Sequence, residues 1–143
     1  LTEHFADYSG RLAENGRVTL VNAEGRSYMK RNDDRYDLVW FVAPDSYAAM
    51  NASSSGAFVL SESYLYTVEM IAESLDHLND DGVVCAQFGE FDYEAKPNRT
   101  ARYVATARKT LRRRGVEDAT KHLVVLTTPG AWYVSTVLVK KAP

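Results

Sequence analysis

The spacing of apolar and polar residues along the chain predicts an alternation of helices and strands. In some segments apolar residues recur at intervals of three and four, as on one face of a helix, and in others they form continuous or β-branched runs, as in strands. The predicted helices are residues 1–13, 64–78 and 98–114, with a short helical or turn segment at 26–34, and Gly115 is the expected C-terminal cap of the last helix. The residues expected to face inward are Leu65, Val68, Ile71, Ala72, Leu75 and Leu78 in the second helix, and Tyr103, Val104, Ala107 and Leu111 in the third. The predicted strands are residues 17–25, 36–43, 83–88, 122–128 and 132–141.

The order of these segments indicates an open α/β sheet. Strands alternate with helices, which is typical of a mainly parallel sheet. The continuous apolar run at 36–43 has the composition of a strand that is covered on both faces. The last two strands are joined by a short link that contains "PG", residues 129–130. Because a parallel return needs a crossover of about a dozen residues, these two strands are expected to form an antiparallel hairpin.

Length and charge narrow the classes of function. The chain has 143 residues, which suits a single domain with one core, and a net charge of −2. General attraction to nucleic acid or to a membrane surface is therefore not expected, and no apolar run is long enough to span a bilayer. The basic run from Arg108 to Gly115 is interpreted as the last turn of a helix with a solvated face. Because the chain starts at Leu1 without a Met, a fragment or a processed product is expected.

Histidine and cysteine usage argues against a metal centre. The three histidines are far apart in the sequence and share no metal-ligand spacing, so no metal site is expected. The single cysteine, Cys85, lies inside an apolar run and is expected to be a buried core residue. A lone reduced cysteine fits a cytoplasmic location, with a membrane anchor elsewhere in a longer protein as the open alternative.

Several motifs taken together resemble a known family. The motifs are "EGRSYM", "RYDLVWF", "DS" and "LYTVE…L…L…DGVV", in that order. Their order and spacing resemble the spermidine synthase-like branch of the Rossmann-like, S-adenosylmethionine-dependent transferases. The resemblance implies a partial Rossmann-like sheet of the class I methyltransferase type, equivalent to the C-terminal part of that domain. The first strands and the glycine-rich loop of the family have no counterpart in the 143 residues.

The resemblance assigns cofactor contacts to Glu24 and Gly25. In the family, an acidic residue at the position of Glu24 accepts a hydrogen bond from the adenine amino group, and the backbone beside it reads the edge of the ring. The implied cofactor is S-adenosylmethionine or its decarboxylated form. The alternative is that Glu24 is a solvated residue in the turn between a strand and a helix.

Asp45 and Ser46 follow the apolar strand 36–43, at the end where open α/β sheets bind ligands. A carboxylate there could hold a cationic amine and accept its proton, which makes Asp45 the candidate catalytic residue. The resemblance places two aspartates in this loop: Asp45 matches the second, and the first falls on Val42. The alternative is that Asp45 caps a loop turn after Pro44.

The segment from Ser61 to Tyr66 is expected at the mouth of the same loop. Glu62 and Tyr66 are candidate substrate-binding residues, whereas capping of the next helix explains most of the neighbouring hydroxyl groups. In the C-terminal hairpin, Thr128 stands where the family places a substrate-binding tyrosine. Trp132 and Tyr133 could substitute for it or could simply pack against the strand.

We therefore expect a transferase that moves an aminopropyl or methyl group from the sulfonium donor to a small amine. The 143 residues by themselves are expected to be inactive, and a homo-oligomer is compatible with the sequence. The alternative function is a non-catalytic α/β module, derived from the same fold, that serves in binding or oligomerisation.

Overall fold

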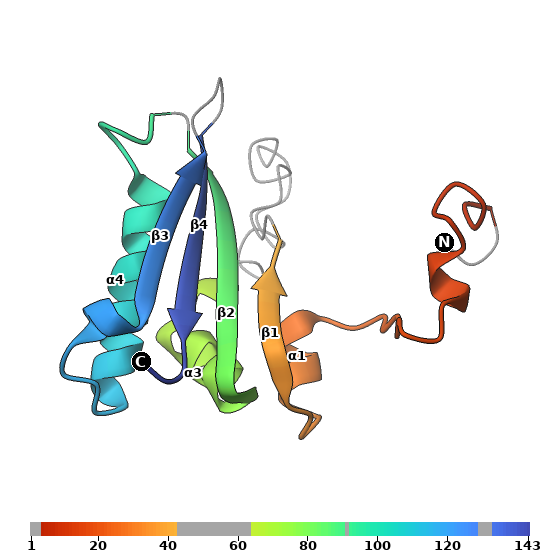
Figure 1. Ribbon diagram of the computed structural model, residues 1–143, viewed down its shortest axis with the longest axis horizontal. Helices are drawn as coiled ribbons and strands as arrows, with labels where there is room; N and C mark the ends of the chain where they lie inside the picture. The colour runs from red at the N-terminus through yellow and green to blue at the C-terminus, as the bar shows by residue number, and fades with distance from the viewer. Residues whose placement is uncertain (1–3, 43–63, 91, 129–132) are drawn as a thin grey trace.

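The computed structural model describes residues 4–42, 64–90, 92–128 and 133–143 (Figure 1). Its centre is a sheet of four strands in the order β1-β2-β4-β3. The strands are β1 (Tyr36–Phe41), β2 (Leu78–Glu90), β3 (Leu123–Thr128) and β4 (Tyr133–Lys140). β1 and β2 are parallel, whereas β4 is antiparallel to both β2 and β3. The predicted α/β sheet with a C-terminal hairpin is confirmed, but only the β1–β2 pair is parallel among the described strands.

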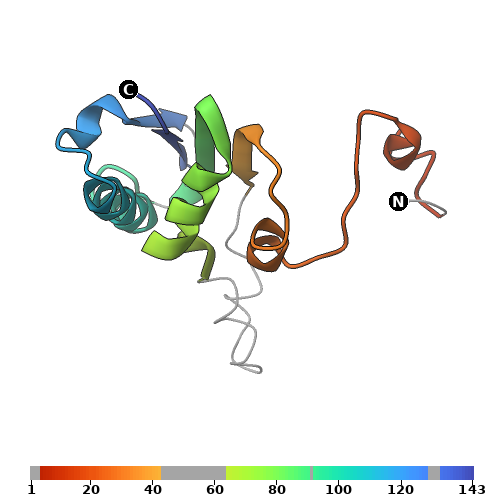
Figure 2. The ribbon, with the colours of Figure 1, turned by 90° about the horizontal axis from the view of Figure 1, so that it is seen from below.

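The helices lie on one side of this sheet (Figure 2). They are α1 (Gly25–Met29), α3 (Val68–Asp76) and α4 (Asn98–Arg113), with short 3₁₀ turns η1 (Leu12–Glu14), η3 (Tyr64–Tyr66) and η4 (Ala119–Lys121). No helix in the described ranges is both long and apolar enough to cross a bilayer.

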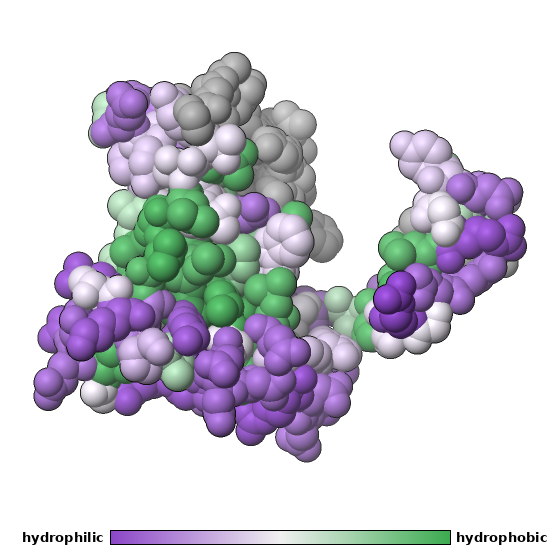
Figure 3. Space-filling model, viewed as in Figure 1, coloured by the Kyte–Doolittle hydropathy of each residue, from purple (hydrophilic) through white to green (hydrophobic). Residues whose placement is uncertain are grey.

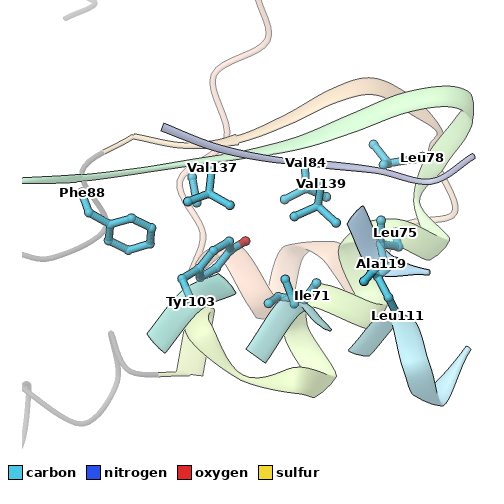
Figure 4. Packing of buried hydrophobic residues seen from close by; sticks show 12 residues of the cluster. Ile71, Leu75, Leu78, Val84, Phe88, Tyr103, Leu111, Ala119, Val137 and Val139 are labelled. Carbon is cyan, nitrogen blue, oxygen red and sulfur yellow. The ribbon is translucent and has the colours of Figure 1, made fainter. Parts of the chain in front are cut away.

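The hydrophobic core lies between the sheet and the two longer helices (Figure 4). Apolar side chains alternate along β2 and β4, so one face of each strand meets the helical stripe of α3 and α4. The main contributors are Val84, Ala86, Val137 and Val139 from the sheet, and Ile71, Leu75, Tyr103, Ala107 and Leu111 from the helices. The predicted inward positions that this core confirms are Ile71, Leu75, Leu78, Tyr103, Ala107 and Leu111.

The C-terminus of α4 ends as the sequence predicts. Gly115 has a φ of 85°, which is the left-handed conformation that glycine adopts without strain. Its N–H donates to the carbonyl of Arg112 at 3.1 Å, and the N–H of Val116 donates to the carbonyl of Leu111 at 3.0 Å. These two bonds form a Schellman motif, which satisfies carbonyls that the helix leaves without partners.

The N-terminal predictions are wrong in two respects. In the described part of residues 1–13, single turns precede the 3₁₀ turn and no continuous helix forms. The segment 17–25, predicted as a strand, pairs with no strand in the described chain. A short helix or a lone strand needs a packing partner to be stable. Here the apolar side chains of Tyr8 and Val21 remain exposed, with relative accessibilities of 93% and 51%.

The junction of α3 and β2 is also tighter than predicted. α3 ends at Asp76 and β2 begins at Leu78, so "NDDG" belongs to the strand and not to a turn before it. The register of β1 against β2 shifts there, because Tyr36 pairs with Leu78 whereas Leu38 pairs with Val83. The extra residues form an irregular, bulged start of the strand.

Candidate functional site

The predicted cofactor residues lie at the N-terminus of α1. Glu24 is the N-cap residue: its carboxylate accepts hydrogen bonds from the backbone N–H groups of Arg26 at 2.9 Å and Ser27 at 2.8 Å. The N–H of Arg26, followed by that of Ser27, lowers the pKa of Glu24, so the side chain is anionic at neutral pH. A capping role in the strand-to-helix turn, the alternative stated for Glu24, is thus present in the structure.

Capping leaves Glu24 able to accept further hydrogen bonds. Each carboxylate oxygen has two lone-pair directions, and each takes one backbone N–H here. Because Glu24 is exposed, both oxygens can also accept from a ligand. An adenine amino group is a donor that such an acceptor could bind, so the residue fits the cofactor that the resemblance implies.

Gly25 lies beside Leu65, a residue of η3. A methyl group built on Gly25 would lie 4.0 Å from Cδ2 of Leu65, which is an ordinary contact. Crowding therefore does not require a glycine at this position. Because Gly25 has no side chain, the backbone at the start of α1 is left uncovered. The start of α1 therefore lies next to η3, although the two segments are about 40 residues apart in sequence.

Tyr66, the substrate-binding candidate that falls within the residues described by the structure, lies in an aromatic cluster. Its ring is 5.6 Å from that of Phe88 and 6.2 Å, edge to face, from that of Tyr103. Phe88 and Tyr103 in turn are 5.2 Å apart, all distances being between ring centroids. Tyr66 is half-buried, so its ring is held in place by core packing.

The remaining predicted residues lie at or beyond the carboxyl end of β1. Val42, where the resemblance places the first loop aspartate, directly follows the strand and is 62% exposed. Asp45, Ser46 and Glu62 lie outside the described residues, as does Trp132. The structure thus brings together the α1 start and η3.

A buried acid that the sequence reasoning missed ends the neighbouring strand. Glu90 is the last residue of β2 and is 5% exposed. Its Oε1 accepts from the backbone N–H of Thr100 at 2.7 Å and from the hydroxyl of Thr100 at 2.9 Å. The Thr100 hydroxyl also lies 2.6 Å from the hydroxyl of Ser135 on β4.

Glu90 replaces the missing cap of α4. Pro97, the N-cap residue of that helix, makes no side-chain capping bond, and a carboxylate near a helix N-terminus is favoured by the helix dipole. The signal that could have found Glu90 is an acid directly after an apolar strand, at the end where parallel sheets bind ligands. β1 and β2 are parallel, so Val42, directly after β1, and Glu90, the last residue of β2, both mark carboxyl ends of strands at the same end of the sheet.

A basic hollow lies on the outer face of α4. It is lined by Ala105, Arg108, Lys109, Arg112 and Arg113. The core-facing residues of the helix, Tyr103, Ala107 and Leu111, are buried, whereas the four cations are exposed. The hollow is therefore formed by a solvated helix face, as the sequence predicted.

The fold is similar to known structures even though the sequence is not. No family model matches the chain, and no curated protein matches it. Two similar solved structures are a spermidine synthase in complex with the transition-state analogue AdoDATO and the spermidine synthase from Thermotoga maritima. In both comparisons the TM-score is 0.56, the identity is 16% and 98% of this chain is covered.

The chain spans only 39% and 40% of the length of those two proteins. At this level of identity the similarity concerns the fold, which agrees with the resemblance seen in the sequence motifs. The chain has the fold of the C-terminal part of a spermidine synthase.

Proposed function

We propose that this chain is the C-terminal part of a spermidine synthase-like transferase domain. The domain binds S-adenosylmethionine or its decarboxylated form and transfers an aminopropyl or methyl group to a small amine. The observation that carries the proposal is the match of 98% of the chain to spermidine synthase structures, one of them in complex with AdoDATO. The buried Cys85 is consistent with a reducing, cytoplasmic location.

In this proposal the start of α1 binds the cofactor. The anionic carboxylate of Glu24 accepts a hydrogen bond from the adenine amino group while it keeps its bonds to Arg26 and Ser27. Gly25 leaves the adjoining backbone open to the ring edge. The sulfonium group of the bound donor would supply a carbon that is activated toward nucleophiles, and the neutral thioether would leave as the C–S bond breaks.

The loop after β1 binds the amine. Asp45, assisted by Ser46 and Glu62, holds the cationic amine and accepts the proton that the nitrogen must lose before its lone pair can attack. Tyr66 forms the wall beneath the substrate. The side chain of Val42 cannot accept a proton. In this proposal Asp45 alone therefore binds the amine and accepts its proton, which two aspartates share in the spermidine synthase-like family.

Calorimetric titration of the complete protein with S-adenosylmethionine and with its decarboxylated form tests the proposal. We expect one of them to bind, and we expect Glu24→Ser to weaken that binding at least about tenfold, because serine caps a helix but provides no carboxylate. Unchanged affinity in Glu24→Ser would restrict Glu24 to its capping role. The absence of binding by both compounds would reject the transferase function.

A non-catalytic binding or oligomerisation module is the second candidate. The discriminating feature is whether a glycine-rich loop precedes Leu1 in the complete protein, because such loops bring the backbone close to a nucleotide cofactor. The 143 residues contain no G-x-G-x-x-G segment. The same titration separates the two candidates, since a module without the cofactor function binds neither compound.

A further inference from the structure

The hollow on the outer face of α4 is lined by cations, most of which have no acidic partner in the described chain. Its lining consists of Ala105, Arg108, Lys109, Arg112 and Arg113. Arg113 lies 3.4 Å from a carboxylate oxygen of Glu69 on α3. Within the described ranges no acidic side chain forms an ion pair with Arg108, Lys109 or Arg112.

The helix dipole does not account for this cluster. Cations are favoured in the last turn of a helix, and the effect falls off beyond that turn. Arg112 and Arg113 lie in the last turn of α4, whereas Arg108 and Lys109 precede it. These two residues also stand four positions before Arg112 and Arg113, a spacing at which like charges repel each other on a helix. An anion bound between the cations would relieve this repulsion.

Ala105 provides the short side chain of the lining. It is exposed and lies one turn before Arg108 and Lys109 on the same side of the helix. A ligand can therefore approach the helix surface at Ala105, while the longer cationic side chains extend around it. Arginine suits a phosphate in particular, because its planar guanidinium donates two parallel hydrogen bonds to phosphate oxygens.

The exposed apolar surface of the chain lies elsewhere. The face of the sheet that the helices leave uncovered exposes apolar side chains (Figure 3), among them Val124 and Leu126 on β3. The apolar stripe of α4 is buried against the sheet. A helix that lies in a membrane surface turns its apolar face to the lipid, and α4 uses that face in the core. The basic hollow is therefore better suited to a soluble anion than to a bilayer.

We propose that the hollow on α4 binds the phosphate group of a soluble phosphorylated small molecule. Arg108 and Arg112 bind the phosphate oxygens, and Lys109 and Arg113 add positive charge around them. The hollow has a volume of about 690 Å³, within the range of about 300–1,000 Å³ that is usual for small-molecule sites. It therefore has room for more of the ligand than its phosphate. This site goes beyond the proposed transferase function, because none of its residues is assigned to that reaction.

Calorimetric titration of the complete protein with inorganic pyrophosphate, at physiological ionic strength, provides the first test. We expect binding, and we expect Arg108→Gln and Arg112→Gln each to weaken it by about tenfold. Arg102→Gln is the matched control, because Arg102 is an exposed arginine of the same helix that does not line the hollow. Its affinity for pyrophosphate should be that of the wild type. The absence of pyrophosphate binding by the wild type overturns the proposal.

A further variant tests the shape of the hollow and leaves its charge unchanged. Ala105→Leu keeps every cation but fills the space above the helix surface, and we expect it to weaken pyrophosphate binding by about tenfold. Leucine is a good helix former, so the domain should remain folded, which far-UV circular dichroism verifies. Normal binding by Ala105→Leu, with equal losses in Arg102→Gln and Arg108→Gln, would indicate diffuse attraction to a charged helix and overturn the proposal.

Vesicles distinguish a soluble phosphate from a lipid headgroup. Vesicles of phosphatidylcholine with phosphatidic acid should sediment no more of the complete protein than vesicles of phosphatidylcholine alone. Binding to the acidic vesicles without binding to pyrophosphate would assign the hollow to a membrane surface and overturn the proposal. Arg108→Gln should bind S-adenosylmethionine or its decarboxylated form as the wild type does, so a failure of this proposal is distinguishable from a failure of the proposed function.

Discussion

The carboxylate of Glu90 accepts both the backbone N–H and the hydroxyl of Thr100, at 2.7 and 2.9 Å. This pair joins the end of β2 to the first turn of α4. Through the Thr100 hydroxyl it also contacts Ser135 on β4, at 2.6 Å between the hydroxyl oxygens. Two successive elements, β2 and α4, therefore meet the C-terminal strand β4 at one buried polar group.

Removal of this carboxylate should destabilise the fold. Glu90→Ala leaves the buried N–H of Thr100 without its acceptor, whereas the Thr100 hydroxyl keeps Ser135 as a partner. We expect the free energy of unfolding to fall by about 2 kcal/mol. Urea unfolding measures the change. Glu94→Ala, which removes an exposed acid four residues later, should have almost no effect. Equal losses in the two variants would show that net charge, and not the Thr100 contact, determines stability.

Two glycines of β2 should respond differently to alanine. At Gly82 an added methyl group would lie 2.8 Å from Cβ of Leu78 and 3.0 Å from the carbonyl oxygen of Tyr36, whereas at Gly89 it meets nothing within 4 Å. We expect Gly82→Ala to lower the free energy of unfolding by about 1–3 kcal/mol, because the bulged start of the strand cannot absorb the crowding. Gly89→Ala should leave the free energy of unfolding unchanged or raise it slightly. Thermal unfolding of both variants measures the difference.

Tyr103 has a buried hydroxyl that makes no hydrogen bond within the described chain. The side chain is 2% exposed, and its hydroxyl points toward the apolar side chains of the sheet (Figure 4). An unpaired hydroxyl in such a site costs about 1–3 kcal/mol. Tyr103→Phe should therefore keep the packing of the ring and raise the free energy of unfolding by about 1 kcal/mol. A clear loss of stability would mean that the hydroxyl has a partner in solution.

The pH dependence of stability provides a second expectation for Tyr103. Burial raises the pKa of this phenol above its usual value. A tyrosine of this kind stabilises the fold below its unfolded pKa of about 10, and the contribution is lost as the pH rises through the higher folded pKa. The free energy of unfolding should thus fall above about pH 10, and it should fall less steeply in Tyr103→Phe. Identical alkaline profiles would assign the loss to other groups.

Asp45 is expected to act in the proposed reaction. Asp45→Asn keeps the size of the side chain but removes the charge that holds the amine and the group that accepts its proton. In the complete protein we expect turnover to be abolished, with the melting temperature nearly unchanged. Asp33→Asn, at an exposed aspartate in the loop before β1, is the control and should retain activity. Normal turnover of Asp45→Asn would remove Asp45 from the mechanism.

Local patterns in the sequence determined much of the core. The apolar stripe of α4 predicted which residues face inward, and Gly115 predicted where the helix ends, because both depend on residues within one or two turns. The short link before β4 determined an antiparallel hairpin for the same reason. The order of the motifs also indicated the spermidine synthase-like fold, which similarity to solved structures confirms.

Tertiary contacts decided the features that depend on distant partners. The segment 17–25 has the composition of a strand, yet it forms none because a strand requires a neighbour and the described chain provides no neighbour there. Glu90 resembles an ordinary surface acid in the sequence, and only the approach of α4 and β4 makes it a buried cap. The sequence by itself thus determined elements with short-range causes, whereas pairing and burial were decided by the tertiary structure, because they depend on which segments meet in space.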